Sequence, residues 1–157
     1  MADTIKPRLL RAGADCDRIA YIVEESKPLT FDDQRIEEAL IRTKAKLVVF
    51  DPIQAYIPPE SDMVNAAKMR QMTRKLAELA ERYRCAIVLI GHMNKTGGGK
   101  NLYRGLGSID LAAAARSVLM IQRDRENPDV RYLFPVKSSL AYEGKAIRFI
   151  FDKDIGF

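Results

Sequence analysis

The sequence has no tryptophan, a single histidine and two cysteines in its 157 residues. Cys16 and Cys85 form no CxxC pair, so we do not expect a zinc site built from the usual cysteine and histidine ligands. No apolar run approaches the ~20 residues that a membrane-spanning helix needs, and the N-terminus holds no apolar signal core. These absences predict a cytoplasmic protein that does not insert into a membrane.

Hydrophobic residues make up 47% of the chain and charged residues 30%, which is typical of a globular protein rather than a disordered one. The length fits one domain, which we expect to span residues 1–157. The net charge of +5 permits a nucleic-acid or nucleotide partner without requiring one. Between Glu81 and Asp110 every charged residue is basic, which suits such a partner or an ordinary solvated surface.

Helical and strand-like segments alternate along most of the chain. Apolar spacing, capping residues and turn residues predict helices over 3–12, 30–44, 61–84 and 108–116. Thr30 is the expected cap of the second helix, and the third has an apolar stripe that should face the core: Met69, Met72, Leu76, Leu79 and Tyr83. Short apolar runs predict strands over 18–23, 46–50, 85–90, 117–123, 130–138 and 146–152. We therefore expect an α/β fold with a mostly parallel sheet and helices on both faces, ending in antiparallel edge strands.

Polar residues follow two of the apolar strands, where an α/β sheet binds its ligands. Asp51 ends "KLVVFD", and four apolar residues followed by aspartate form the Walker B pattern. His92 ends "CAIVLIGH", where a polar side chain can sense a γ-phosphate or orient a water molecule. Each residue also has a plainer explanation, because aspartate and histidine often simply cap a strand. Together they indicate the second half of a RecA-type ATPase core.

The glycine cluster "GHMNKTGGGKN" suggests a phosphate-binding loop but does not match one. The motif G-x-x-x-x-G-K-[ST] requires glycine five residues before Gly99, where the chain has Asn94, and a hydroxyl after Lys100, where it has Asn101. The motif occurs nowhere else in the 157 residues. We interpret this stretch as a basic loop whose glycines give it conformational freedom.

The chain closely resembles the RecA-like ATPases of the AAA_25 type, whose relatives include the hexameric helicases RepA and DnaB. The resemblance runs from about residue 3 to 151 and rests on "LVVFDPIQAYI", "CAIVLIGHMNKTGGGKNLYRGLGSIDLAAAARSVLMI" and "PVKSSLAYEGKAIRF". It implies an ATP-binding core of a protein for DNA replication or repair. It also implies ATP and Mg²⁺ as cofactors, single-stranded DNA as a partner, and a homo-oligomeric ring or filament.

The resemblance assigns roles to residues at the strand ends and in the glycine-rich loop. Asp51 resembles the Walker B aspartate, which acts on Mg²⁺ through water, and Gln54 occupies a polar position that follows it. His92 lies where the family has its sensor. Residues 93–104 resemble the second DNA-binding loop, in which Lys95 and Lys100 would meet phosphates and Tyr103 would stack on a base.

Two further cations resemble residues that act on a neighbouring subunit's nucleotide. Arg104 resembles an arginine that reaches across the interface in hexameric relatives. Lys137 matches the first residue of the "K-x-K" or "K-x-R" element, but Ser139 stands where the second basic residue would be. Cations at such positions offset the charge that develops in phosphoryl transfer.

The family's Walker A strand, loop and helix have no counterpart in the sequence, and neither does the strand that ends in the catalytic glutamate. We therefore expect an incomplete domain, the product of a truncated gene or an expressed C-terminal piece, with weak or absent ATP binding by itself. One alternative is a non-hydrolysing RecA-like paralogue that binds DNA or a partner subunit. Another is a small α/β hydrolase in which Asp51 and His92 form an acid–base pair.

Overall fold

The computed structural model describes residues 5–23, 27–58, 66–92, 109–142 and 144–150. Its contacts divide the chain into two compact units, one of residues 21–115 and one of residues 1–20 with 116–157. In the described ranges, no helix is both long and apolar enough to cross a bilayer. The two units are treated separately below.

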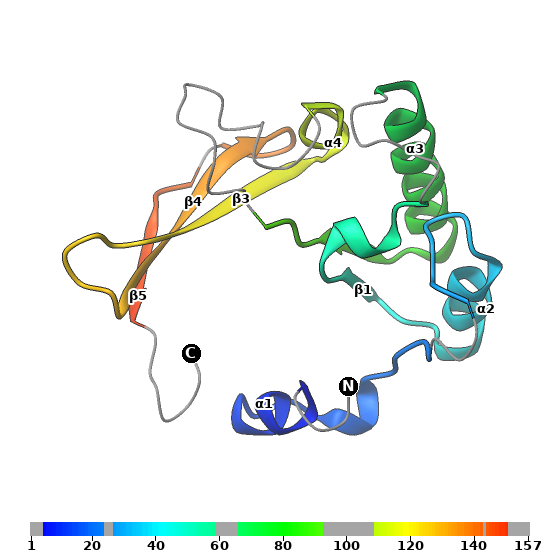
Figure 1. The fold of residues 1–157 in the computed structure, drawn as a ribbon, viewed down its shortest axis with the longest axis horizontal. Helices are drawn as coiled ribbons and strands as arrows, with labels where there is room; N and C mark the ends of the chain where they lie inside the picture. Colours follow the sequence, from blue (N-terminus) through cyan, green and yellow to red (C-terminus); the bar gives the residue numbers. More distant parts are fainter. Residues whose placement is uncertain (1–4, 24–26, 59–65, 93–108, 143, 151–157) are drawn as a thin grey trace. The chain divides into compact units, whose positions relative to one another are not determined.

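The unit of residues 21–115 is built on a parallel pair of strands with helices beside it (Figure 1). Strand β1 (Leu47–Phe50) pairs with β2 (Ala86–Leu89), so that Leu47 lies opposite Ala86 and Phe50 opposite Leu89. The helices are α2 (Gln34–Thr43), α3 (Ala66–Tyr83) and α4 (Ile109–Ala114), and a short 3-10 helix, η2, covers Ile53–Tyr56. These elements confirm the predicted order of helices and strands, whereas η2 lies where we expected only a loop.

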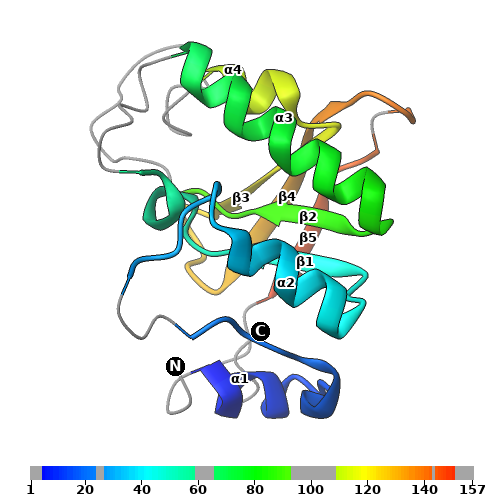
Figure 2. The same cartoon turned by 90° about the vertical axis from the view of Figure 1, so that its right-hand side faces the viewer.

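One face of the parallel pair carries the hydrophobic core. Figure 2 shows α2 and α3 lying over β1 and β2. The apolar stripe predicted for the long helix is confirmed, because Met69, Met72 and Leu76 are buried in the core and Leu79 and Tyr83 pack against it. The buried side chains from the two helices are Ile36, Leu40, Met69, Met72 and Leu76, and they pack with Phe50.

The other face of the same two strands is exposed. Side chains alternate between the two faces of a strand. Leu47 and Val49 of β1 are 56% and 48% exposed, and Val88 of β2 is 42% exposed. The expectation of helices on both faces is therefore wrong for the described part of this unit, since α2 and α3 pack on the same side.

Three aromatic rings join the segment before α2 to the end of β1. The Phe50 ring lies 5.0 Å from the rings of both Phe31 and Tyr56, in edge-on geometry. The backbone N–H of Phe31 donates to the carbonyl of Tyr56 at 3.0 Å. This cluster anchors η2 directly after the strand that ends at Asp51.

The segment 18–23 does not form the strand that we predicted. Residues Cys16–Arg18 form a 3-10 helix, and residues 19–23 form no regular secondary structure. Ile22 packs against the core, while Tyr21 and Val23 are 60% and 54% exposed. Alternating apolar residues suit an extended segment, but a strand also requires a neighbouring backbone, which none of the described segments supplies.

The second unit contains a three-stranded antiparallel sheet. Strands β3 (Ser117–Arg123), β4 (Val130–Ser138) and β5 (Ile147–Ile150) pair in the order β3-β4-β5. The antiparallel C-terminal strands are thus confirmed, and the fold is mixed α/β with one parallel and one antiparallel sheet. The described strands do not form one mostly parallel sheet, because β3 pairs with β4 across a short turn.

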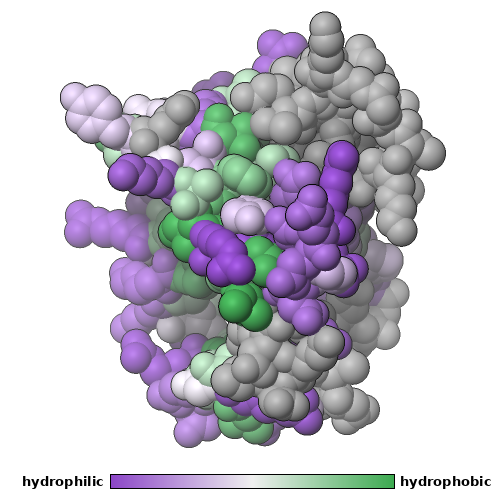
Figure 3. Space-filling view, turned by 90° about the vertical axis from the view of Figure 1, so that its left-hand side faces the viewer, coloured by the Kyte–Doolittle hydropathy of each residue, from purple (hydrophilic) through white to green (hydrophobic). Residues whose placement is uncertain are grey.

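Both the N-terminal helix and the antiparallel sheet of this unit expose apolar side chains. Helix α1 (Ile5–Arg11) has no buried residue, and Gly13 ends it with a φ of 74°. Leu119, Ile121 and Ile147 of the sheet are 58–63% exposed. Figure 3 shows that apolar side chains are exposed among hydrophilic ones on the face in view.

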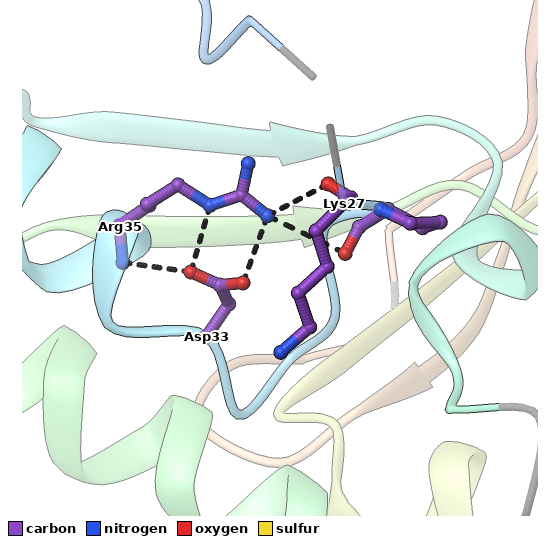
Figure 4. A network of polar contacts seen from close by, with 4 residues as sticks. Lys27, Asp33 and Arg35 are labelled. Carbon is purple, nitrogen blue, oxygen red and sulfur yellow. Dashed lines mark hydrogen bonds and ion pairs between the residues drawn. The ribbon is translucent and has the colours of Figure 1, made fainter. Parts of the chain in front are cut away.

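Helix α2 begins with a charged cap that also holds the preceding segment (Figure 4). Asp33, rather than the expected Thr30, is the N-cap, and its Oδ1 accepts from the backbone N–H of Arg35 at 2.9 Å. The Arg35 guanidinium donates to both Asp33 oxygens at 2.8 and 2.9 Å, and to the carbonyl of Lys27 at 3.0 Å. Hydrogen bonds from the Arg35 side chain and backbone, aided by the charges of Arg35 and Lys27, lower the pKa of Asp33 from 3.8 to about 2.

We expect Asp33→Ala to destabilise the protein by about 1 kcal/mol at neutral pH, because the helix loses its cap and Arg35 loses its ion pair with Asp33. The lowered pKa means that the stabilisation is complete above about pH 4 and declines as the pH falls toward 2. Urea unfolding at a series of pH values should show the difference between wild type and Asp33→Ala narrowing below pH 4. Asp33→Asn, which can cap but does not titrate, serves as the control, and a pH-independent difference for Asp33→Ala would contradict the account.

Candidate functional site

The carboxyl ends of β1 and β2 lie at the same edge of the parallel pair, and backbone hydrogen bonds continue beyond them. The N–H of Ile90 donates to the carbonyl of Phe50 at 2.9 Å. The N–H of Ile53 then donates to the carbonyl of Ile90 at 2.8 Å. The segment from Asp51 to Ile53 is thus joined to the segment that leads to His92.

The three polar residues predicted at this edge are all on the surface. Asp51 and His92 are exposed where they follow their strands. Gln54 lies within η2 and is also exposed, because the neighbouring Ile53 takes the buried position at 3% exposure. The buried Phe50 and Ile53 therefore hold the backbone on either side of Asp51, and the carboxylate is left accessible.

The edge offers one carboxylate, which limits the cation that it could hold. Among the described residues, no group of three or more histidine, cysteine, aspartate or glutamate side chains could hold a metal ion. Mg²⁺ commonly binds through one or two carboxylates together with water and substrate phosphates. Asp51 fits that mode, in which the remaining ligands come from a phosphate and from solvent.

The titratable groups with shifted pKa values lie elsewhere and have structural causes. Glu37 on α2 accepts from the Tyr83 hydroxyl at 2.6 Å and from Arg82 at 2.7 Å, and these bonds lower the pKa of Glu37 and raise that of Tyr83. Burial raises the pKa of the Cys85 thiol, which makes it a poor nucleophile. The hydrogen bonds of Glu37 join α2 to α3 and leave the strand ends untouched.

A hollow of about 350 Å³ lies between the start of α2 and helix α3. Its walls include two ion pairs, Lys75 with Asp32 at 2.8 Å and Arg82 with Glu37 at 2.7 Å. None of the residues predicted for nucleotide chemistry lines it. We assign no function to this hollow, because its charged groups already pair with one another.

Comparison with known proteins identifies the family of this chain. Residues 1–98 match the family model AAA_25, described as an AAA domain. The chain belongs to the AAA_25 family. No curated protein matches the chain.

Among solved structures, this AAA_25 chain is similar to one described as the crystal structure of the RadB recombinase. The TM-score is 0.54 at 17% sequence identity, and the match covers 78% of this chain and 56% of that one. At this identity the likeness shows the fold, and it supports the RecA-like resemblance at that level. The AAA_25 chain spans little more than half the length of the recombinase chain.

Of the remaining predicted site residues, the structure describes only Lys137. Lys137 lies on β4, in the other compact unit, where it is half-buried opposite Val118. The predicted DNA-binding and interface residues of the glycine-rich loop lie outside the described residues: Lys95, Lys100, Tyr103 and Arg104.

Sequence reasoning missed the part of the edge that is made by the backbone. The pattern "DPIQAYI" gave no sign that the Ile53 N–H would bind the Ile90 carbonyl. The apolar residue two positions after Asp51 was the available signal, because a buried residue so close to a strand end fixes the path of the chain.

We expect Asp51→Asn to change the free energy of unfolding by no more than about 0.5 kcal/mol, because Asp51 is exposed and the described residues offer its carboxylate no hydrogen-bond or ion-pair partner. The neighbouring Phe50→Ala should cost about 3–5 kcal/mol, since that ring is buried in the core. Urea unfolding of the two variants measures both. A large loss for Asp51→Asn would mean that the carboxylate has a structural role.

Proposed function

We propose that the chain is the distal part of a RecA-like ATPase core whose parent protein works on DNA in replication or repair. The observation that carries the proposal is the joining of Asp51 and His92 to one edge by the hydrogen bonds through Ile90. Membership of the AAA_25 family and the RecA-like fold support it. In this proposal Asp51 is the Walker B aspartate and would hold Mg²⁺ through water, Gln54 assists it, and His92 is the sensor.

The hydrogen-bonded connection suggests how the sensor would work. A phosphate bound near Asp51 would affect the position of His92, because the Ile90 carbonyl accepts a hydrogen bond from the Ile53 N–H and so joins the segments that hold Asp51 and His92. His92 leads directly into residues 93–104, which we propose as the DNA-binding loop, with Lys95 and Lys100 on phosphates and Tyr103 on a base. Arg104 and Lys137 would act on the nucleotide of a neighbouring subunit.

The exposed face of β1 and β2 supports the proposal that the chain associates with other subunits. Parallel sheets are covered on both faces, whereas Leu47, Val49 and Val88 are largely exposed. Edges and faces of this kind favour pairing with another chain. A homo-oligomer, as a ring or a filament, would cover such surfaces.

A second candidate is a non-hydrolysing RecA-like paralogue that acts as a DNA- or subunit-binding module. It is favoured by the absence of G-x-x-x-x-G-K-[ST] from the 157 residues. The coding sequence upstream of Met1 separates the two candidates. An in-frame phosphate-binding motif there would favour the ATPase, and an independent start site would favour the paralogue.

We expect the purified chain to hydrolyse ATP at a negligible rate, with or without Mg²⁺. In P-loop ATPases the phosphate-binding loop and its lysine provide most of the triphosphate contacts, and the 157 residues do not contain that motif. Release of inorganic phosphate measures this, with Asp51→Ala as the matched variant. Turnover that is readily measured and is abolished by Asp51→Ala would overturn the proposal that the core is incomplete.

We expect weak, salt-sensitive binding of single-stranded DNA, to which the glycine-rich loop contributes. Changing Lys95, Lys100 and Arg104 together to alanine should weaken binding, and loss of the two proposed phosphate contacts of Lys95 and Lys100 should reduce the slope of log K against log salt by about 2. Fluorescence anisotropy of a labelled oligo(dT) at several salt concentrations measures both. Unaltered binding by this variant would show that the loop assignment is wrong.

A further inference from the structure

One face of the antiparallel sheet carries two aromatic rings side by side. Tyr132 and Phe134 alternate with Leu133 along β4 and therefore share a face. Their ring centroids lie 5.9 Å apart with the planes tilted by 32°. Both side chains are half-buried. The pair forms an aromatic platform on a sheet of known register.

The register adds polar and basic side chains to the same face. Gln122 of β3 and Arg148 of β5 lie opposite Tyr132 on either side, and both are exposed. Lys137 lies opposite Val118, which shares this face with Gln122 by strand alternation. A hollow of about 490 Å³ adjoins the rings and is lined by residues that include Gln122, Arg125, Tyr132 and Phe134.

Two acidic residues, Asp124 and Glu126, line the same hollow, and Asp124 is held within the turn. Asp124 accepts from the backbone N–H groups of Glu126 and Asn127, both at 2.8 Å. These two bonds, with smaller contributions from the Tyr132 hydroxyl and the charge of Arg148, lower the pKa of Asp124. The carboxylate therefore serves to hold the hairpin turn and the Tyr132 hydroxyl, and its charge is offset locally.

The two faces of the sheet differ in chemistry. The opposite face exposes the aliphatic side chains of Leu119, Ile121 and Ile147, which suits contact with protein. The aromatic face combines rings and an amide with cations. The opposite face also carries Phe149 and the paired Arg123 and Arg131, so the cations that the register places on the aromatic face are Arg148 and Lys137.

We propose that this aromatic face binds single-stranded nucleic acid, with Tyr132 and Phe134 stacking on bases and Arg125 and Arg148 meeting phosphates. Stacking on aromatic rings beside a basic surface is a general mode of single-strand binding, and sheets present such rings to unpaired bases. The Gln122 amide supplies a donor and an acceptor for a base edge. The proposal rests on the proposed function, in which the parent works on a polynucleotide, and adds a contact separate from residues 93–104.

The first test compares the two faces of the sheet in the full chain. Tyr132→Leu with Phe134→Leu should weaken binding of a labelled oligo(dT) by about tenfold or more, because two stacking contacts are lost. Phe149→Leu is the matched control, since Phe149 lies opposite Arg131 on the other face and should leave binding unchanged. Thermal unfolding checks that the variants fold.

A second variant tests the same proposal even if the ring substitutions prevent folding. Arg125→Gln with Arg148→Gln changes two exposed side chains and should reduce the slope of log K against log salt by about 2. Unchanged affinity of the folded ring variant, or an unchanged slope for the arginine variant, would overturn the proposal. Absence of any oligo(dT) binding by the wild-type chain would also overturn it.

Photo-cross-linking separates this surface from the glycine-rich loop. Trypsin releases residues 132–137, "YLFPVK", which contain both rings, and residues 101–104, "NLYR", which contain Tyr103. With oligo(dT) carrying 4-thiothymidine, we expect cross-links in residues 132–137. Cross-links in 101–104 alone would overturn this inference and leave the proposed function standing. Cross-links in 132–137 alone would support the inference and count against the loop assignment.

Discussion

Hydrogen bonds between two parallel strands continue one step past the strands themselves, and the candidate site depends on that step. The Ile90 N–H binds the Phe50 carbonyl, and the Ile90 carbonyl then accepts the N–H of Ile53. Phe50 and Ile53 are each 3% exposed, so the backbone on both sides of Asp51 is held by buried side chains. An exposed carboxylate is thereby presented on a rigid support, which is the arrangement that ion binding at a sheet edge requires.

The same parallel pair is covered on one face only. The helices α2 and α3 bury one face, and the bonds of Glu37 to Tyr83 and Arg82 join the two helices. The opposite face remains apolar and exposed in the described residues. In the proposed oligomer, a subunit that covered this face would also stabilise the strands that position Asp51.

The antiparallel sheet has two faces with different chemistry, and its register makes them so. Pairing Gln122 with Tyr132 and Arg148 places an amide, a phenol and a guanidinium in one row. A shift of one residue would exchange this row for Ile121 or Leu133, because the side-chain period of a strand is two. The placement of Tyr132, Phe134 and Arg148 on one face, and of Leu119, Ile121 and Ile147 on the other, is therefore a property of the pairing.

Much of the fold could be predicted from local apolar patterns, because in those segments the tertiary contacts favour the same secondary structure as the local sequence. The strands at 117–123 and 130–138 have the predicted bounds, and the stripe of Met69, Met72 and Leu76 is the core. The strand predicted at 18–23 failed because its alternation says nothing about a pairing partner. The prediction of Thr30 as the cap of α2 was also wrong. Asp33 caps the helix instead, because its carboxylate accepts a hydrogen bond from the backbone N–H of Arg35.

The sequence by itself determined which residue types follow each strand, that the glycine cluster does not match the phosphate-loop motif, and which family the motifs resemble. Only the tertiary structure decided that Asp51 and His92 follow strands joined at one edge, and that Tyr132 and Phe134 share a face with Arg148. The physical reason is that residue types and spacing are local properties of the chain. Strand pairing and register arise from hydrogen bonds between segments far apart in sequence.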